Sequence, residues 1–169
     1  VLLFLLSLLS KAMAASLPLV LLLTDYFKGR KMDRKAWIEK VPFFFLSLIF
    51  GAIAISAQKT TGAMLDSTTF TISQRIVFAC YGFITYLVKL VLPINLSAYY
   101  PYPVASGQSI QFIYYTYILW LIILVVFIFY SIRYSKKIIL GTGFFTIAIC
   151  LVLQLVPVGG AVMADRYSY

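Results

Sequence analysis

The sequence predicts an all-α fold in which several helices cross a lipid bilayer. Hydrophobic residues make up 63% of the 169 residues and charged residues only 11%, far from the balance of a soluble domain. The apolar residues come in long blocks, as membrane-spanning helices require. Most of the cations lie in two short segments between those blocks, which is typical of loops on the cytoplasmic side. We therefore expect a polytopic integral membrane protein.

The net charge of +9 comes mainly from these two segments. They hold nine of the fourteen Lys and Arg: Lys28, Arg30, Lys31, Arg34, Lys35 and Lys40, then Arg133, Lys136 and Lys137. This placement follows the positive-inside bias, so we expect no nucleic acid partner. The chain has no histidine, which excludes a His-ligated metal and a Ser–His triad from these residues. Single cysteines inside apolar segments are expected to be small buried hydrophobes.

We expect five spans in one domain that covers residues 1–169, at about 1–9, 12–27, 42–57, 110–130 and 138–156. The first begins within an apolar run, so we expect a fragment of a longer membrane domain. The third is about sixteen residues, against the roughly twenty that a crossing needs, so its ends extend into the flanks. An aromatic belt precedes the fourth, which leads to the second basic segment.

A sixth helix, at about residues 74–92, is expected to lie along the extracytoplasmic surface or to enter the membrane and return. The charge bias places both the polar segment before this helix and the start of the next span on that side, so a single crossing would break the parity. Helical spacing puts Arg75, Phe78, Gly82, Thr85 or Tyr86, and Lys89 on one face, opposite a strongly apolar face. Two nearby prolines exclude a regular helix from Leu92–Pro103.

The same topology places five cations on the extracytoplasmic side, against the usual bias: Lys11, Lys59, Arg75, Lys89 and Arg166. A phosphate or pyrophosphate at the membrane surface would explain them, because cations bind such groups through charge-assisted hydrogen bonds. Lys11, Lys89, Arg166 and Arg75 are the candidate lipid-phosphate ligands. Alternatively, Lys11 and Lys89 extend to headgroups, and Arg166 pairs with Asp165.

The tyrosines of the segment after the sixth helix allow two interpretations. Tyr99, Tyr100 and Tyr102 suit either an interfacial aromatic belt or the lining of a sugar or peptide site. Asp165 beside Arg166 is expected to orient that residue rather than to act as a general base, and Asp165 is also a candidate for the substrate lining. The catalytic residues stay unassigned, and no metal ligands are predicted.

Three segments together resemble the membrane domain of the transmembrane-and-tetratricopeptide protein O-mannosyltransferases and their bacterial relatives, which belong to the GT-C glycosyltransferase class. They are SLLSKAMAASLPLVLLLTDY (Ser7–Tyr26), LPINLSAYYPYP (Leu92–Pro103) and ADRYSY (Ala164–Tyr169). The resemblance covers nearly the whole chain and depends on the order and spacing of the three segments.

The resemblance implies transfer of a sugar, such as mannose, from a polyprenyl-phosphate donor to a protein or glycan acceptor on the extracytoplasmic face. It assigns Lys11, Arg166 and Lys89 to the lipid phosphate and adds Tyr167 to the substrate lining. The acidic catalytic loop, with any divalent metal, would lie before Val1, and tetratricopeptide repeats would follow Tyr169. The expected location is a bacterial inner membrane, or the endoplasmic reticulum membrane of a eukaryote.

Two other functions stay open at this point. A transporter or flippase for an anionic lipid or solute would also place cations within a helical bundle. Such proteins usually contain a second, related half with interrupted helices, which this sequence does not show. A non-catalytic membrane subunit that presents an aromatic surface to a partner is the third interpretation.

Overall fold

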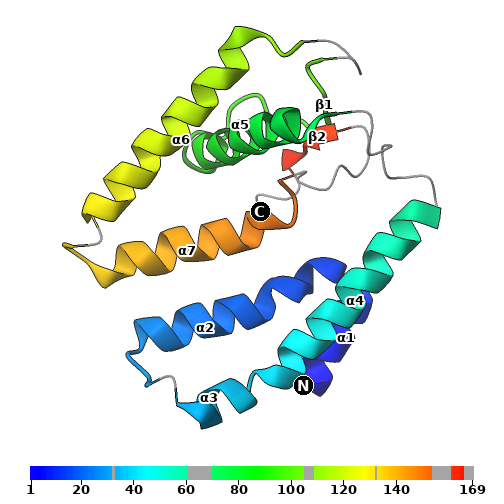
Figure 1. Cartoon of the computed structure of the whole chain (residues 1–169), viewed down its shortest axis with the longest axis vertical. Coiled ribbons are helices and arrows are strands. Elements are labelled where there is room, and N and C mark those ends of the chain that lie inside the picture. The colour runs from blue at the N-terminus through cyan, green and yellow to red at the C-terminus, as the bar shows by residue number, and fades with distance from the viewer. Residues whose placement is uncertain (32, 61–69, 105–108, 132, 154–160, 166–169) are drawn as a thin grey trace. The chain divides into compact units, whose positions relative to one another are not determined.

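The computed structural model describes residues 1–31, 33–60, 70–104, 109–131, 133–153 and 161–165. The chain is mostly helical, at 74%, which confirms the helical part of the predicted fold class. It divides into two compact units (Figure 1). Unit 1 comprises Val1–Thr61 and Ser131–Leu151, and unit 2 comprises Gly62–Tyr130 and Val152–Tyr169.

Unit 1 is built entirely of helices in its described part. They are α1 (Leu2–Ser10), the 3₁₀-helix η1 (Ala12–Ser16), α2 (Leu17–Phe27), α3 (Arg34–Ile38), α4 (Val41–Thr60) and α7 (Lys136–Cys150). Pro18 lies in the first turn of α2, where its missing N–H has no helical partner to lose. The predicted span at 12–27 is therefore a 3₁₀-helix followed by an α-helix.

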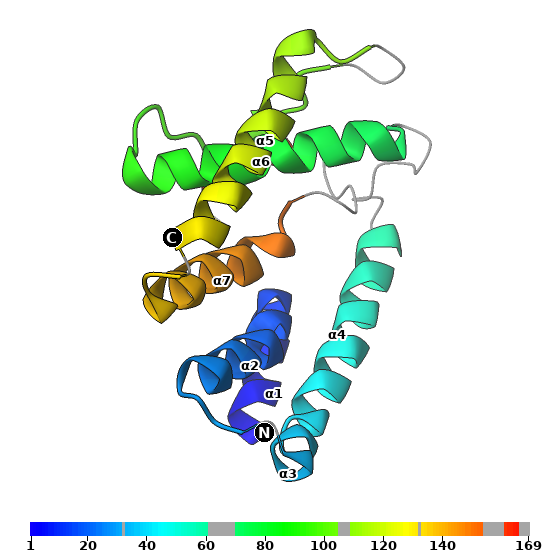
Figure 2. The ribbon, with the colours of Figure 1, turned by 60° about the vertical axis from the view of Figure 1, so that its left-hand side comes forward.

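Helix α7 lies alongside α2 in both views (Figures 1 and 2). The contact is close because Gly143 has no side chain: a Cβ there would lie 2.9 Å from Cδ1 of Leu23. Leu23 is four residues before the end of α2, Gly143 is the central residue of α7, and the end of α2 and the start of α7 lie on the same side in Figure 1. The basic segments that follow Phe27 and precede Lys136 therefore lie at the same end of unit 1, as the charge pattern predicts.

Unit 2 contains α5 (Ile72–Val91), β1 (Tyr100–Pro101), α6 (Phe112–Ser131) and β2 (Ala161–Met163). Strands β1 and β2 pair antiparallel, with Tyr100 opposite Met163 and an irregularity before Pro101. This small sheet was not predicted, so the expectation of an all-α fold is corrected here. The reason is local: the prolines exclude a helix after Val91, and the extended backbone at Tyr100–Pro101 can pair with a second segment.

Helix α5 begins with a capping box between Thr71 and Gln74, which satisfies two backbone N–H groups at the helix start. It ends at Val91, just before Pro93. The predicted bounds of 74–92 are confirmed within two residues. Helix α6 crosses α5 (Figure 2), where Tyr81 packs edge-on against Tyr114 and Tyr117.

The face of α5 that carries the predicted cationic stripe is the one that packs inside unit 2. Phe78, Gly82 and Tyr86 are buried there. On the opposite side, Val77 and Cys80 are buried in the first half of the helix, whereas Val88 is 51% and Leu90 56% exposed near its end. An apolar face directed outward suits contact with lipid, where exposure carries no hydrophobic penalty.

Three helical segments are long and apolar enough to cross a membrane: Arg34–Thr60, Ile72–Val91 and Phe112–Ser131. They include the predicted spans at 42–57 and 110–130, and they indicate membrane association. They also include α5, so the prediction that this helix does not cross stays a prediction. The predicted span at 138–156 corresponds to α7, which has 15 residues and a length of about 22 Å at 1.5 Å per residue.

Candidate functional site

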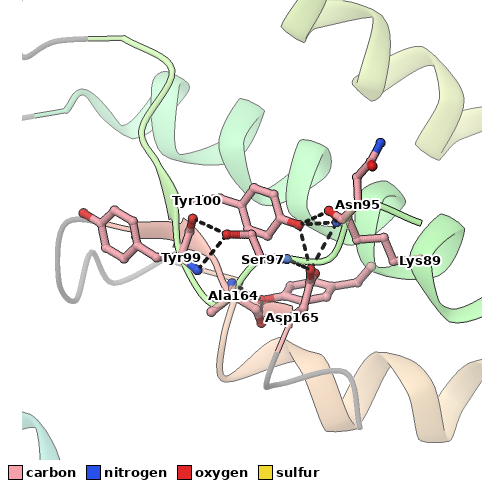
Figure 3. Close-up of polar contacts among 8 residues, drawn as sticks. Lys89, Asn95, Ser97, Tyr99, Tyr100, Ala164 and Asp165 are labelled. Atoms are coloured by element: carbon pink, nitrogen blue, oxygen red, sulfur yellow. Dashed lines mark hydrogen bonds and ion pairs between the residues drawn. The ribbon is translucent and has the colours of Figure 1, made fainter. Parts of the chain in front are cut away.

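Five residues from three segments of unit 2 form a partly buried polar cluster (Figure 3): Lys89, Asn95, Ser97, Tyr100 and Asp165. Its centre is the Oδ2 atom of Asp165. Oδ2 accepts from the Tyr100 hydroxyl at 2.6 Å, the Ser97 backbone N–H at 2.6 Å and the Lys89 ammonium at 3.2 Å. The Lys89 and Asp165 side chains are only 11% and 4% exposed. We call these five residues the Lys89–Asp165 cluster.

Lys89 approaches the cluster from the last turn of α5. Its ammonium donates to the Asn95 carbonyl at 3.0 Å, to the Tyr100 hydroxyl and to Asp165. The same nitrogen lies 4.4 Å from the centroid of the Tyr100 ring, within the range of a cation–π contact. A lysine has three N–H donors, so every donor of Lys89 has a protein oxygen as partner.

The turn after α5 positions the Asn95 carbonyl. Asn95 adopts a left-handed conformation with φ of 53°, which asparagine tolerates better than most residues. Its carbonyl oxygen accepts from Lys89 and also lies 2.9 Å from the Tyr100 hydroxyl. The sequence Pro93–Ile94–Asn95 thus ends the helix and turns the chain back over the side chain of Lys89.

Backbone hydrogen bonds hold Asp165 in this position. Its N–H donates to the Ser97 carbonyl at 3.2 Å, while the Ser97 N–H donates to its carboxylate. One residue earlier, the fully buried Tyr86 hydroxyl donates to the Ala164 carbonyl at 3.1 Å and accepts from the Ala164 N–H at 3.0 Å. Ala164 and Asp165 are therefore fixed to both α5 and the segment that follows it.

The environment of Asp165 keeps its carboxylate ionised. Burial alone would raise the pKa of this group, but hydrogen bonds from Tyr100, Ser97 and Lys89, with the charge of Lys89, outweigh burial and lower the pKa below its usual value. A carboxylate stabilised in this way is a weak base. The geometry therefore suits a positioning role for Asp165, and the expectation that it is not a general base stays a prediction.

The structure changes the interpretation of Lys89. It was predicted to bind a lipid phosphate, but its donors are directed to Asn95, Tyr100 and Asp165. It also forms an ion pair with Asp165 at 3.2 Å. The pair that the sequence suggested between Asp165 and Arg166 stays a prediction. Arg166 and Tyr167 lie outside the described residues.

Arg75, another candidate phosphate ligand, does not lie near Lys89. Arg75 is at the opposite end of α5, fourteen positions away, which is about 21 Å along the helix axis. Its Nε donates to the Phe70 carbonyl at 3.1 Å. Lys11 belongs to unit 1, where it is exposed at the junction of α1 and η1.

The three tyrosines predicted to line a substrate site have different surroundings. Tyr100 belongs to the cluster, whereas Tyr99 is 55% exposed. Tyr102 packs its ring against Phe70 and Phe78, with centroid distances of 4.6 and 5.3 Å. Burial raises the pKa of Tyr102 to about 12. This side chain therefore contributes to the core of unit 2.

Sequence reasoning did not identify the roles of Asn95, Ser97 and Tyr86. Asn95 and Ser97 act largely through backbone groups, which carry no side-chain pattern. A signal was available for Asn95, because asparagine shortly after a helix-ending proline favours a left-handed turn. Tyr86 was placed on the correct face of α5, but its partner is 78 positions away.

No group of three His, Cys, Asp or Glu that could hold a metal occurs in the part of the chain that the structure describes. Comparison with known proteins found no matching family model, no similar curated protein and no similar solved structure. The class that the fold defines is thus a mainly helical protein with three helices able to cross a membrane. Its particular activity is a matter for proposal.

Proposed function

We propose that this chain is part of a GT-C-like integral-membrane glycosyltransferase. It would transfer a sugar from a polyprenyl-phosphate donor to a protein or glycan acceptor on the extracytoplasmic face. The observation that carries the proposal is the Lys89–Asp165 cluster. It joins two of the three segments behind the resemblance, because Ser97 and Tyr100 belong to LPINLSAYYPYP and Asp165 belongs to ADRYSY.

The cluster supports this chemistry because it holds the backbone of Asp165, the residue directly before Arg166, in place. Lys89 and Asp165 neutralise each other, and the backbone of Asp165 is bonded to Ser97. Arg166 is next in the chain. In the proposal its guanidinium binds the lipid phosphate, and a fixed starting point lowers the entropy lost when the phosphate is held.

The leaving group gives the cations their role. When the sugar departs, negative charge develops on the phosphate oxygen of the carrier, and fixed cations at a partly dehydrated interface stabilise that charge. Arg166 and Lys11 are the proposed ligands, with Lys89 in a positioning role. Sugar activation and acceptor deprotonation fall to an acidic loop, with any metal, outside this chain.

The proposed topology has five spans and an extracytoplasmic helix α5 that does not cross. It places Lys11 and Arg166 at the same membrane face. The combined length of η1 and α2 supports a single span here. With a rise of about 2.0 Å for each of the five residues of η1 and about 1.5 Å for each of the eleven residues of α2, the two helices together come close to the roughly 30 Å of the hydrocarbon core. The corresponding location is a bacterial inner membrane, or the endoplasmic reticulum membrane in a eukaryote.

The test is alanine replacement of Arg166 and of Lys11 in the full-length enzyme, with Lys59→Ala as the matched control. Lys59 is an exposed cation at the end of α4 that has no role in the proposal. We expect each of the first two variants to lose on the order of 100-fold in sugar transfer and to bind the polyprenyl-phosphate donor more weakly. The control should keep full activity. Unchanged transfer in both test variants would refute the phosphate-binding role.

A flippase or transporter for an anionic lipid is the second candidate. It is favoured by the interruption at Lys11, where the backbone is extended between α1 and η1, since discontinuous helices often form transport sites. Reconstituted vesicles distinguish the two functions. Movement of a labelled anionic lipid between leaflets, without sugar transfer, would favour this candidate over the glycosyltransferase.

A further inference from the structure

The charged side chains between α2 and α4 fall into two sets. Those that form ion pairs with one another are the inner set, and the cations that form none with the described residues are the outer set. Arg30 pairs with Glu39 at 2.7 Å and lies 3.7 Å from Asp25, and Lys40 pairs with Asp25. The inner set thus contains as many carboxylates as cations. The outer set consists of four exposed cations with no ion pair to any described residue: Lys28, Lys31, Arg34 and Lys35. We call these four residues the basic patch.

The inner pairs determine which way α3 faces. Lys40 is 5% exposed, and its ammonium donates to both Asp25 and the Ala36 carbonyl. This contact ties the end of α3 to the end of α2 and buries Ala36, which is 2% exposed. The remaining side chains of the short helix are consequently directed outward, including those of Arg34 and Lys35.

Large apolar side chains are exposed next to these cations. Trp37 is 48% exposed, Ile38 61% and Tyr26 57%. Helix α3 forms the first residues of the candidate span Arg34–Thr60. Cations flanked by tryptophan at the start of a span are the arrangement expected at the level of lipid headgroups, where the ring lies in the interface and the charges meet phosphates.

We infer that the basic patch with Trp37 is a docking surface for anionic phospholipid headgroups. Charge complementarity identifies the occupant. Asp25 and Glu39 are taken up by the ion pairs of the inner set, so Asp33 is the one carboxylate of this segment without an ion pair among the described residues, against the four cations of the patch. The exposed apolar neighbours distinguish a lipid surface from a soluble polyanion, which would leave Trp37 and Ile38 in water. This inference goes beyond glycosyl transfer and does not rest on it.

Quenching of Trp37 by brominated lipids tests the inference. The full chain carries two tryptophans, so a Trp120→Phe background leaves Trp37 as the only reporter. Vesicles of phosphatidylcholine receive brominated phosphatidylglycerol or brominated phosphatidylcholine, and the two quenching curves give the relative binding constant of the two lipids at this site. Each cation near an anionic surface is expected to contribute about fivefold. We expect a preference for phosphatidylglycerol of at least that size, which falls as NaCl is raised.

Two triple variants with the same loss of charge provide the comparison. Lys28→Gln, Lys31→Gln and Lys35→Gln together should remove most of the preference. Arg133→Gln, Lys136→Gln and Lys137→Gln together should leave most of it. Both sets spare the Asp25–Lys40 pair, and circular dichroism checks that the helices persist. Equal quenching by the two lipids in the parent protein, or an equal loss of preference in both triple variants, would overturn the inference.

Discussion

Breaking the Lys89–Asp165 ion pair should destabilise unit 2 by about 3 kcal/mol. Removing one partner of a buried pair costs about 3–5 kcal/mol, because the other charge is left buried without compensation. The lower end applies here for two reasons. The Lys89 side chain is 11% exposed, and after Lys89→Met the carboxylate of Asp165 keeps hydrogen bonds from Tyr100 and Ser97. Asp165→Asn should cost a similar amount, since three donors then face a neutral amide.

The two changes should not be additive. The double variant Lys89→Met with Asp165→Asn removes both charges, so its cost should fall below the sum by about 1–3 kcal/mol, the usual coupling for residues in direct contact. Lys59→Met is the control, because an exposed cation without an ion pair among the described residues should change stability by no more than about 0.5 kcal/mol.

The thiol of Cys80 provides a local assay. It is 8% exposed in the first half of α5, so a thiol reagent reaches it only when unit 2 opens. In detergent micelles, with Cys150 replaced by serine, the labelling rate follows the open fraction when reclosing is faster than labelling. A loss of 3 kcal/mol corresponds to an increase of about 150-fold. An increase below about threefold in both single variants, or strict additivity in the double variant, would refute the reasoning.

Three further predictions concern single positions. The folded protein lowers the pKa of Asp165, so the ionised carboxylate stabilises the fold at pH values above the unfolded pKa of about 4. This stabilisation is lost as the pH falls through the folded pKa. Denaturant titrations should show the loss, and Asp165→Asn should reduce it. Gly29→Ala should lower thermal stability by about 1 kcal/mol, because Gly29 has φ of +65° at the end of α2 and an added Cβ would meet nothing; Gly29→Asn should recover part of the loss. Gly143→Ala should cost at least about 1 kcal/mol, because its Cβ would lie 2.9 Å from Leu23. Gly141→Ala in the same helix meets nothing within 4 Å and should be neutral or stabilising; equal thermal shifts for the two glycine variants would contradict the packing of α7 on α2.

The sequence was a good guide wherever one segment's own chemistry decides its structure. Long apolar blocks predict helices at 42–57 and 110–130, and the helices are present there. The prolines after Leu92 predict the end of α5 and the extended segment that follows. The stripe with Phe78 and Gly82 was identified correctly as one face of α5, although whether that face would be packed or open was not predicted.

The candidate site was predicted only in part, because its geometry depends on residues far apart in the chain. Lys89, Tyr100 and Asp165 were each identified as candidates. Their mutual contact was not, since 76 positions separate Lys89 from Asp165 and no local period connects them. The sequence suggested Arg166, which lies outside the described residues, as a partner of Asp165, and did not indicate that Lys89 donates to this carboxylate at 3.2 Å.

By itself the sequence determined the helical, membrane-associated class and the grouping of cations between apolar blocks. Hydropathy and charge placement are properties of short segments and do not depend on long-range contacts. Only the tertiary structure decided that α5 packs through its cationic stripe, that β1 pairs with β2, and that Lys89 binds the carboxylate of Asp165. A nearly buried lysine requires a partner that satisfies its charge, and which carboxylate meets it is set by how the chain folds back on itself.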